Sequence, residues 1–122
     1  MGNIIPIEDV NKFLVRIKQA IANGKYRFEG KRRKNVESLA LAGILPKHVK
    51  GYIMALTYLD YFNGPEPERG SKFPPGQYLF FGCIINGWEF FIKVKVEDHT
   101  GDDFCVCISF HIAASPIYYP YR

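Results

Sequence analysis

The stretch YLFFGCIINGWEFFIKVKV, residues 78–96, decides the fold of this chain. Its two halves are rich in β-branched and aromatic residues, and they flank Asn86-Gly87, the dipeptide that most strongly favours a two-residue hairpin turn. Such a turn fixes the strand register, so we expect Ile85 to lie opposite Trp88. We therefore predict two antiparallel strands, one on each side of this turn.

Upstream of the hairpin the pattern is helical. Residues 8–23 place Val10, Leu14, Ile17 and Ile21 at spacings of four, three and four, which is one apolar stripe of an amphipathic helix. A second and a third helix are predicted further along, because a capping residue, a closing glycine and an initiating proline follow in order: Asn35, Gly43 and Pro46.

The fold class predicted from this order is α+β, with N-terminal helices packed on one face of a C-terminal antiparallel β-sheet. At 122 residues the chain is expected to form a single domain. Its predicted parts are a mainly helical region at 8–60 with a basic segment at 31–34, a loop rich in Pro and Gly at 61–76, an antiparallel meander at 77–112, and a tail at 113–122.

Composition excludes several classes of protein. The hydrophobic share of 48% and the charged share of 23% are those of a globular chain. No apolar run approaches the roughly 18–20 residues of a membrane span, and residues 1–6 do not resemble a signal peptide. Three cysteines do not make a disulfide framework. We therefore expect a cytoplasmic protein with no membrane association.

Charge is distributed unevenly along the chain. The formal net charge is +4, but residues 1–61 hold 11 Lys or Arg against 5 Asp or Glu, whereas residues 62–122 hold 5 against 7. The densest basic run is Lys31-Arg32-Arg33-Lys34. A basic half joined to a mildly acidic one indicates a polyanion or an acidic protein as partner.

Alternation along the predicted strands separates two faces of the sheet. The face toward the helices is expected to hold Leu79, Phe81, Cys83, Ile85, Trp88, Phe90, Ile92, Val94, Val96, Val106, Ile108 and Phe110. The opposite face is expected to hold Tyr78, Phe80, Phe91, Lys93, Lys95, Cys105, Cys107, Ser109 and His111. Lysines attract phosphate, aromatic rings stack on bases, and histidine exchanges protons near neutral pH, so this face predicts an RNA surface. The alternative is a solvated face or a subunit contact.

Other patterns carry little chemistry. Cys105-x-Cys107 with His111 lacks a second ligand pair at structural-zinc spacing. Cys107 and His111 are four residues apart on one predicted strand, about 13 Å, which is too far for a nucleophilic pair. Glu89 has no carboxylate partner on the outer face of the hairpin. We therefore expect neither a metal site nor a cofactor.

Two groups of residues carry a family resemblance. The first is Arg33-Lys34-Asn35, followed by LALAGI at 39–44 and LTYLDYF at 56–62. The second is GWEFFIKVK at 87–95, leading to CISFH at 107–111. In order and spacing they resemble the MqsR family of bacterial toxins, part of the wider RelE-like group, over roughly residues 10–111.

The resemblance implies a RelE-like fold and the toxin of a type II toxin-antitoxin system, a metal-independent endoribonuclease that cuts mRNA. It also implies a cognate antitoxin, in that family a zinc-containing DNA-binding protein. By position, the family's catalytic lysine near the C-terminus falls on His111, its active-site tyrosine on Phe91, and another lysine on Asn63. Histidine keeps acid/base capacity, but Phe91 has no hydroxyl and Asn63 has no charge.

The residues assigned to catalysis are His111 as base or acid, with Lys93 and Lys95 stabilising the charge on phosphate. The residues assigned to RNA binding are Arg32, Arg33 and Lys34 for flanking phosphates, and Phe80 and Phe91 for stacked bases. Two alternatives remain, namely an RNA-binding module without catalysis and a protein-interaction domain that uses the aromatic face.

Overall fold

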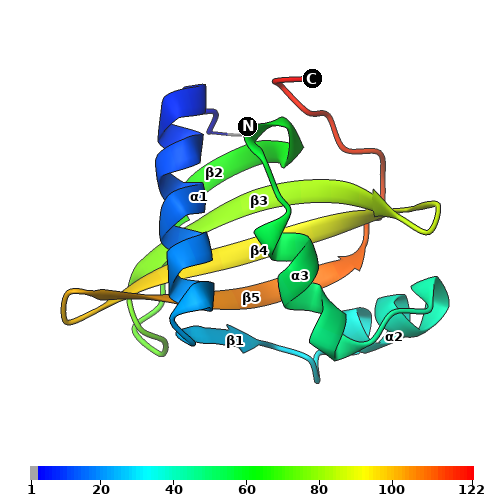
Figure 1. Ribbon diagram of the computed structural model, residues 1–122, viewed down its shortest axis with the longest axis horizontal. Coiled ribbons are helices and arrows are strands. Elements are labelled where there is room, and N and C mark those ends of the chain that lie inside the picture. The colour runs from blue at the N-terminus through cyan, green and yellow to red at the C-terminus, as the bar shows by residue number, and fades with distance from the viewer. Residues whose placement is uncertain (1–2) are drawn as a thin grey trace.

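The computed structural model describes residues 3–122 (Figure 1), so the first two residues of the predicted domain and of the N-terminal stretch lie outside it. The elements in chain order are α1 (Ile7–Ala22), β1 (Tyr26–Phe28), α2 (Arg33–Ala42), a 3-10 turn (Pro46–His48), α3 (Val49–Met54), a second 3-10 turn (Tyr58–Asp60), β2 (Tyr61–Pro67), β3 (Gly76–Ile85), β4 (Trp88–His99) and β5 (Asp102–Ile112).

The fold is α+β, as predicted. The strands form one sheet in the order β1-β5-β4-β3-β2, and in Figure 1 α1 and α3 cross in front of it while α2 lies beside the end of β5. One strand departs from the predicted antiparallel arrangement, because β1 pairs with β5 in parallel, with Tyr26 opposite Cys105. The sheet is therefore mixed.

The hairpin prediction is confirmed. Ile85 pairs with Trp88, and the ladder continues to Tyr78 opposite Lys95. Asn86 and Gly87 both have positive φ, 51° and 84°, which is the backbone of the turn that such a dipeptide favours. The Asn86 amide also donates a 2.8 Å hydrogen bond to a carbonyl at the end of α2, so the turn is tied to the helical layer.

The predicted loop at 61–76 is wrong in its first half, because residues 61–67 form β2. This strand lies at the edge of the sheet with β3 as its neighbour, and its register shifts twice. Pro65 and Pro67 are compatible with that position, since one side of an edge strand needs no backbone donors for the ladder. The loop itself is confined to residues 68–75.

The predicted start of the second helix is also displaced. Helix α2 begins at Arg33, two residues before the expected cap, and ends as predicted at Gly43 with φ of 72°. Asn35 is therefore inside the helix and buried, and its amide nitrogen donates hydrogen bonds to the backbone carbonyls of Glu29 at 2.9 Å and Ile108 at 3.0 Å. The side chain joins α2 to the sheet instead of capping the helix.

The face assignment fails in β5 because of a β-bulge. The ladder between β4 and β5 shifts between Lys93 opposite Ser109 and Val94 opposite Cys107. One extra residue on β5 reverses the alternation for everything before it. The predicted faces are therefore exchanged for four residues: Cys105 and Cys107 lie in the core, whereas Val106 and Ile108 lie on the other side.

The core lies between the helices and the inner face of the sheet. Among its fully buried side chains are Val10, Ile17, Leu79, Phe81, Phe90, Ile92 and Phe110, which are predicted inner positions of the first helix and of the strands. Val49 and Ile53 of α3 are fully buried with them. Trp88 is an exception at 41% exposure, because it lies next to the hairpin turn at the end of the strand. Most of the apolar positions predicted for the first helix and for the hairpin strands are thus the ones that pack together in the core.

Candidate functional site

The face of the sheet away from the helices, the outer face, carries a row of aromatic and basic side chains from all five strands. The C-terminal tail crosses one end of this face, and residues 68–75 cover the other. Two concavities lie between these covers. The outer face includes the side chains of Arg27 of β1, Phe62 of β2, Tyr78 and Phe80 of β3, Phe91, Lys93 and Lys95 of β4, and Ser109 and His111 of β5.

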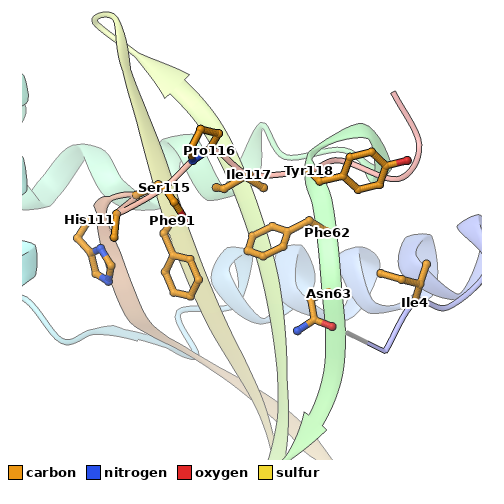
Figure 2. Close-up of a pocket in the computed structure, with 11 residues that line it drawn as sticks. Ile4, Phe62, Asn63, Phe91, His111, Ser115, Pro116, Ile117 and Tyr118 are labelled. Carbon is orange, nitrogen blue, oxygen red and sulfur yellow. The ribbon is translucent and has the colours of Figure 1, made fainter. Parts of the chain in front are cut away.

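The first concavity, the aromatic pocket, has a volume of about 770 Å³. Figure 2 shows its floor, with the rings of Phe62 and Phe91 side by side, His111 at one end and Asn63 at the other. The lining consists of Ile4, Phe62, Asn63, Phe91, His111 and residues 113–118. No Lys, Arg, Asp or Glu contributes to it, so within residues 3–122 this is an uncharged pocket with polar groups at its edge.

The imidazole of His111 lies against the ring of Phe91, with centroids 5.2 Å apart and planes 17° from parallel. Its Nδ1 is 3.1 Å from the carbonyl oxygen of Ile112. A carbonyl oxygen only accepts, so Nδ1 carries the hydrogen and the neutral ring presents the lone pair of Nε2. This arrangement leaves Nε2 as a proton acceptor beside a flat aromatic platform.

The second concavity, the charged pocket, has a volume of about 360 Å³. Its lining comprises Arg27, Glu29, Arg32, Glu68, Phe73, Tyr78, Lys93, Lys95, Glu97 and Ile108. Two of the four basic groups are matched by carboxylates, because Arg27 pairs with Glu29 and Lys95 pairs with Glu68 and Glu97. Within residues 3–122, Arg32 and Lys93 form no salt bridge, and they are the cations this pocket offers to an anion.

Lys93, which lines the charged pocket, lies near two residues of the aromatic pocket, Phe91 and His111. Phe91 pairs with His111 and Lys93 pairs with Ser109, so Lys93 and His111 are diagonal neighbours whose Cβ atoms are about 7 Å apart. The Lys93 ammonium lies 4.3 Å from the centroid of the Tyr78 ring, a cation–π contact that holds it over the outer face. The two residues therefore share the outer face, but the Lys93 ammonium lies over rings of β3, on the side of β4 away from His111.

The expectation that Lys95 lies on an open surface is wrong. Its side chain is 2% exposed, with Nζ 3.0 Å from both Glu68 and Glu97. The ammonium also donates to the carbonyl of Pro74 in the loop that covers it. With its hydrogen bonds used in this way, Lys95 holds residues 68–75 against the sheet and offers no free donor to a phosphate.

Glu68, one of the two acids that pair with Lys95, is stabilised as a carboxylate. Glu68 accepts a short hydrogen bond from the hydroxyl of Tyr78, and together with Lys95 this lowers the pKa of Glu68 from 4.5 to about 2. Burial, followed by the hydrogen bond to Glu68, raises the pKa of Tyr78 to about 12. The two groups therefore stay in their neutral-pH forms, carboxylate and phenol, over a wide range.

The predicted basic run divides between two places. Arg32, immediately before α2, lines the charged pocket. Arg33 forms a salt bridge with Glu37 one helical turn along, at 3.2 Å, and Lys34 is exposed on the same helix. Of the three residues assigned to RNA binding in this run, only Arg32 lines either of the two pockets.

The two phenylalanines assigned to base stacking also differ. Phe91 lines the aromatic pocket, whereas Phe80 is 8% exposed and lies behind it, with its ring centroid 5.8 Å from that of Phe91. Phe62 is 6.1 Å from Phe80 and 5.9 Å from Phe91. Phe80 therefore supports the two rings that a ligand can reach.

Sequence reasoning missed Arg27, Phe62 and the tail. Tyr26 and Phe28 point into the core, so alternation across β1 places Arg27 on the outer face, a signal that was available in the sequence. Phe62 follows from recognising β2 as a strand. The contribution of residues 113–118 could not be found by periodicity, because they form no regular element.

The three side chains considered above as metal ligands, and rejected there, do not converge in the structure. Cys105 and Cys107 are buried in the core, and His111 faces outward from the same strand. Burial raises the pKa of the Cys105 thiol to about 12. Among residues 3–122 no group of three or more His, Cys, Asp or Glu side chains could hold a metal ion.

Comparison with models of protein families, with curated proteins and with solved structures finds no match for this chain. The helices within residues 3–122 are all too short or too polar to cross a membrane. The function is therefore argued from the two pockets and from the residues that line them.

Proposed function

We propose that the outer face binds RNA and cleaves it, and that the protein is an mRNA endoribonuclease toxin of the MqsR type. The observation that carries this proposal is the convergence of Asn63, Phe91 and His111. The resemblance singled out these three positions, which come from strands β2, β4 and β5, and all three line the aromatic pocket.

The adjoining charged pocket supports the same proposal. RNA presents flat bases and a repeating phosphate charge, and proteins bind it by combining aromatic platforms with cations along the backbone path. Phe91 and Lys93 supply one group of each kind, two residues apart on β4, or about 7 Å. Arg32 extends the cationic path beyond Lys93.

The chemistry needs a proton acceptor, a cation and a proton donor. Nε2 of His111 takes the proton from a ribose 2′-hydroxyl, O2′ bonds to phosphorus, and the bond from phosphorus to O5′ breaks. The ammonium of Lys93 stabilises the charge that develops on the phosphate oxygens and gives a proton to O5′. The products are a 2′,3′-cyclic phosphate and a 5′-hydroxyl, and no metal takes part.

The biological setting follows from the resemblance. As a toxin of a type II system, the protein acts on mRNA in the cytoplasm and is inhibited by a cognate antitoxin, which in the MqsR family is a zinc-containing DNA-binding protein. Compared with that family, His111 stands at a catalytic lysine position. Phe91 and Asn63 line the pocket without a hydroxyl or a charge, so the proton transfer rests on His111 and Lys93.

Incubation of the purified protein with end-labelled RNA tests the proposal. Wild type is expected to cut RNA equally with and without a chelator, leaving 2′,3′-cyclic phosphate ends, and to arrest growth when expressed. His111→Phe keeps a ring against Phe91 but has no proton to exchange, so it is expected to bind RNA and cut none. Full activity in His111→Ala would remove His111 from the mechanism.

A non-catalytic RNA-binding module is the second candidate. Phe91 has no hydroxyl and Asn63 no charge at positions where the resembling family uses a tyrosine and a lysine, and these two departures favour binding without cleavage. The same incubation separates the two functions. A binder retards RNA in a gel without shortening it, and its affinity is unchanged by His111→Phe.

A further inference from the structure

The C-terminal tail is built onto the outer face through one carboxylate. Glu89 of β4 accepts hydrogen bonds from the backbone N–H of Ile117 and from the hydroxyl of Tyr119, both at 3.0 Å. At the end of the chain Arg122 pairs with Asp60 at 2.9 Å. The tail is therefore held at both its middle and its end, and residues 113–116 lie between β5 and the first of these anchors.

Gly82 on β3 provides the space in which the tail lies. A Cβ at this position would meet the hydroxyl of Tyr119 and would come within 2.7 Å of Ile117 Cδ1. Both neighbours belong to the tail, so the absence of a side chain at Gly82 lets the tail pack directly on the strand. The sheet and the tail are thus matched in shape at this point.

The tail forms one wall of the aromatic pocket and places an exposed aromatic side chain at its rim. Residues 113–118 close the aromatic pocket on one side, and Figure 2 shows Pro116, Ile117 and Tyr118 along its upper edge. Tyr118 is 82% exposed, an aromatic side chain at the rim of an aromatic pocket. An exposed ring beside a pocket is a surface on which a flat ligand can stack.

At the opposite edge Asn63 offers a directed polar group. Its Oδ1 accepts a 2.7 Å hydrogen bond from the backbone N–H of Asn3, and this fixes the orientation of the amide. In Figure 2 the amide nitrogen lies on the side of Phe91 and Phe62. One of its two hydrogens is directed to Glu66 at 3.4 Å, which leaves the other for a ligand acceptor.

We propose that the tail completes a subsite for one unpaired nucleobase, which makes residues 113–118 a specificity-determining wall of the ribonuclease site. This inference rests on the proposed function and identifies the substrate as single-stranded RNA with a base splayed into the pocket. The base lies over Phe62 and Phe91, its edge accepts from Asn63, and its phosphate lies toward Lys93.

The occupant follows from the charge of the two concavities. The aromatic pocket has no charged lining residue within 3–122 and cannot balance a phosphate, whereas the neighbouring charged pocket has two unpaired cations, Arg32 and Lys93. A nucleotide has an uncharged flat base and an anionic phosphate, and these two parts match the aromatic pocket and the charged pocket. A base still paired in a duplex could not enter between the tail and the sheet, because its edge would be occupied.

The test uses nucleosides, which have a base and no phosphate, followed by amide NMR shifts of the whole chain. The four nucleosides are expected to shift pocket amides, and ribose 5-phosphate is expected to shift those of the charged pocket. Gly82→Ala, which displaces the tail, and Tyr118→Ala, which removes the exposed ring, are each expected to weaken nucleoside binding at least tenfold. Neither substitution should change the binding of ribose 5-phosphate.

A matched control is Gly51→Ala on α3, where an added Cβ meets nothing within 4 Å. It is expected to bind nucleosides as wild type does. If Gly82→Ala fails to fold, Tyr118→Ala still tests the subsite, because the Tyr118 side chain is 82% exposed and its removal is not expected to affect folding. Base preference provides a further readout, since Asn63→Asp exchanges a donor for acceptors and is expected to change the order in which the four nucleosides bind.

The outcomes separate this inference from the proposed function. Nucleoside shifts that disappear in both tail variants support the subsite, even if wild type fails to cut RNA. If wild type cuts RNA but nucleosides cause no pocket shifts, or bind both tail variants unchanged, the subsite is overturned and the ribonuclease stands. Shifts with N-acetyltryptophanamide and none with nucleosides would assign the pocket to a peptide side chain and also overturn it.

Discussion

Asn35 on α2 holds the backbone of Phe110 on β5, 75 residues away: its Oδ1 accepts a 2.9 Å hydrogen bond from the Phe110 N–H. The same side chain donates to the carbonyl of Ile108 at 3.0 Å, on the other side of Ser109. These backbone groups lie at the β-bulge, where the ladder with β4 is interrupted. Asn35 therefore satisfies backbone groups on both sides of Ser109, in the part of β5 that extends beyond its last partner on β1.

Replacement of Asn35 is expected to be costly. Asn35→Ala leaves the Phe110 N–H and the Ile108 and Glu29 carbonyls without their partner in a buried place, and we expect the free energy of unfolding to fall by about 3 kcal/mol. Denaturant unfolding measures this. Val36→Ala, at the next and exposed position of α2, is the control and is expected to change stability by less than about 1 kcal/mol. A loss in Asn35→Ala no larger than in the control would contradict the role of the side chain.

The sequence was sufficient for the hairpin and for the helix stripes. Asn86-Gly87 determines the register of β3 and β4, and the alternation then places Phe91 and Lys93 correctly. The same reasoning failed for residues 105–108, which precede Ser109 on β5. A β-bulge adds one residue to the strand, and no residue type in this stretch indicates that it is there. His111, which lies on the other side of the bulge from Cys107, kept its predicted face.

Long-range partners explain the remaining differences. Nothing local to Lys95 distinguishes it from Lys93, and its burial depends on Glu68 and Pro74 from a loop that periodicity cannot position. The proline-rich strand β2 was hidden for a related reason. Proline argues against a central strand, and only the completed sheet shows that this strand is at the edge.

The Lys95 cluster is expected to be structural. Lys95→Met leaves the carboxylate of Glu97, which is 3% exposed, without its 3.0 Å partner, and we expect the free energy of unfolding to fall by about 3–5 kcal/mol. Lys95→Met combined with Glu97→Gln removes one of the two carboxylates that lose Lys95 and is expected to recover part of this loss. A thermodynamic cycle of the two substitutions measures the interaction. If the double variant is less stable than Lys95→Met, the assigned pairing is wrong.

Stability is expected to decline in acid through Glu68. Its folded-state pKa is lowered to about 2, first by the Tyr78 hydroxyl and then by Lys95, so its contribution is fully present above its ordinary value of 4.5 and is lost as pH falls from 4.5 toward 2. Unfolding midpoints of wild type and Glu68→Gln should therefore differ at pH 6 and converge near pH 2. The exposed residue Glu37 gives the comparison, because Glu37→Gln should keep the wild-type acid dependence. Parallel pH profiles for wild type and Glu68→Gln would show that the carboxylate does not act in this way.

RNA binding is expected to depend on salt through Lys93. Among residues 3–122 its ammonium has no acidic partner. When such a group neutralises one phosphate of a single strand, cations condensed on the RNA are released, and this contributes about 0.7 to the magnitude of the slope of log K against log salt concentration. Lys93→Gln should weaken binding most at low salt and reduce the slope by about this amount. Lys50→Gln removes an equal charge on α3, an element on the opposite face of the sheet, and should leave the slope unchanged.

Filter-binding titrations over a series of salt concentrations compare the three proteins. Equal slopes for Lys93→Gln and wild type would mean that the RNA backbone does not cross the charged pocket, and the path proposed for it would have to be abandoned.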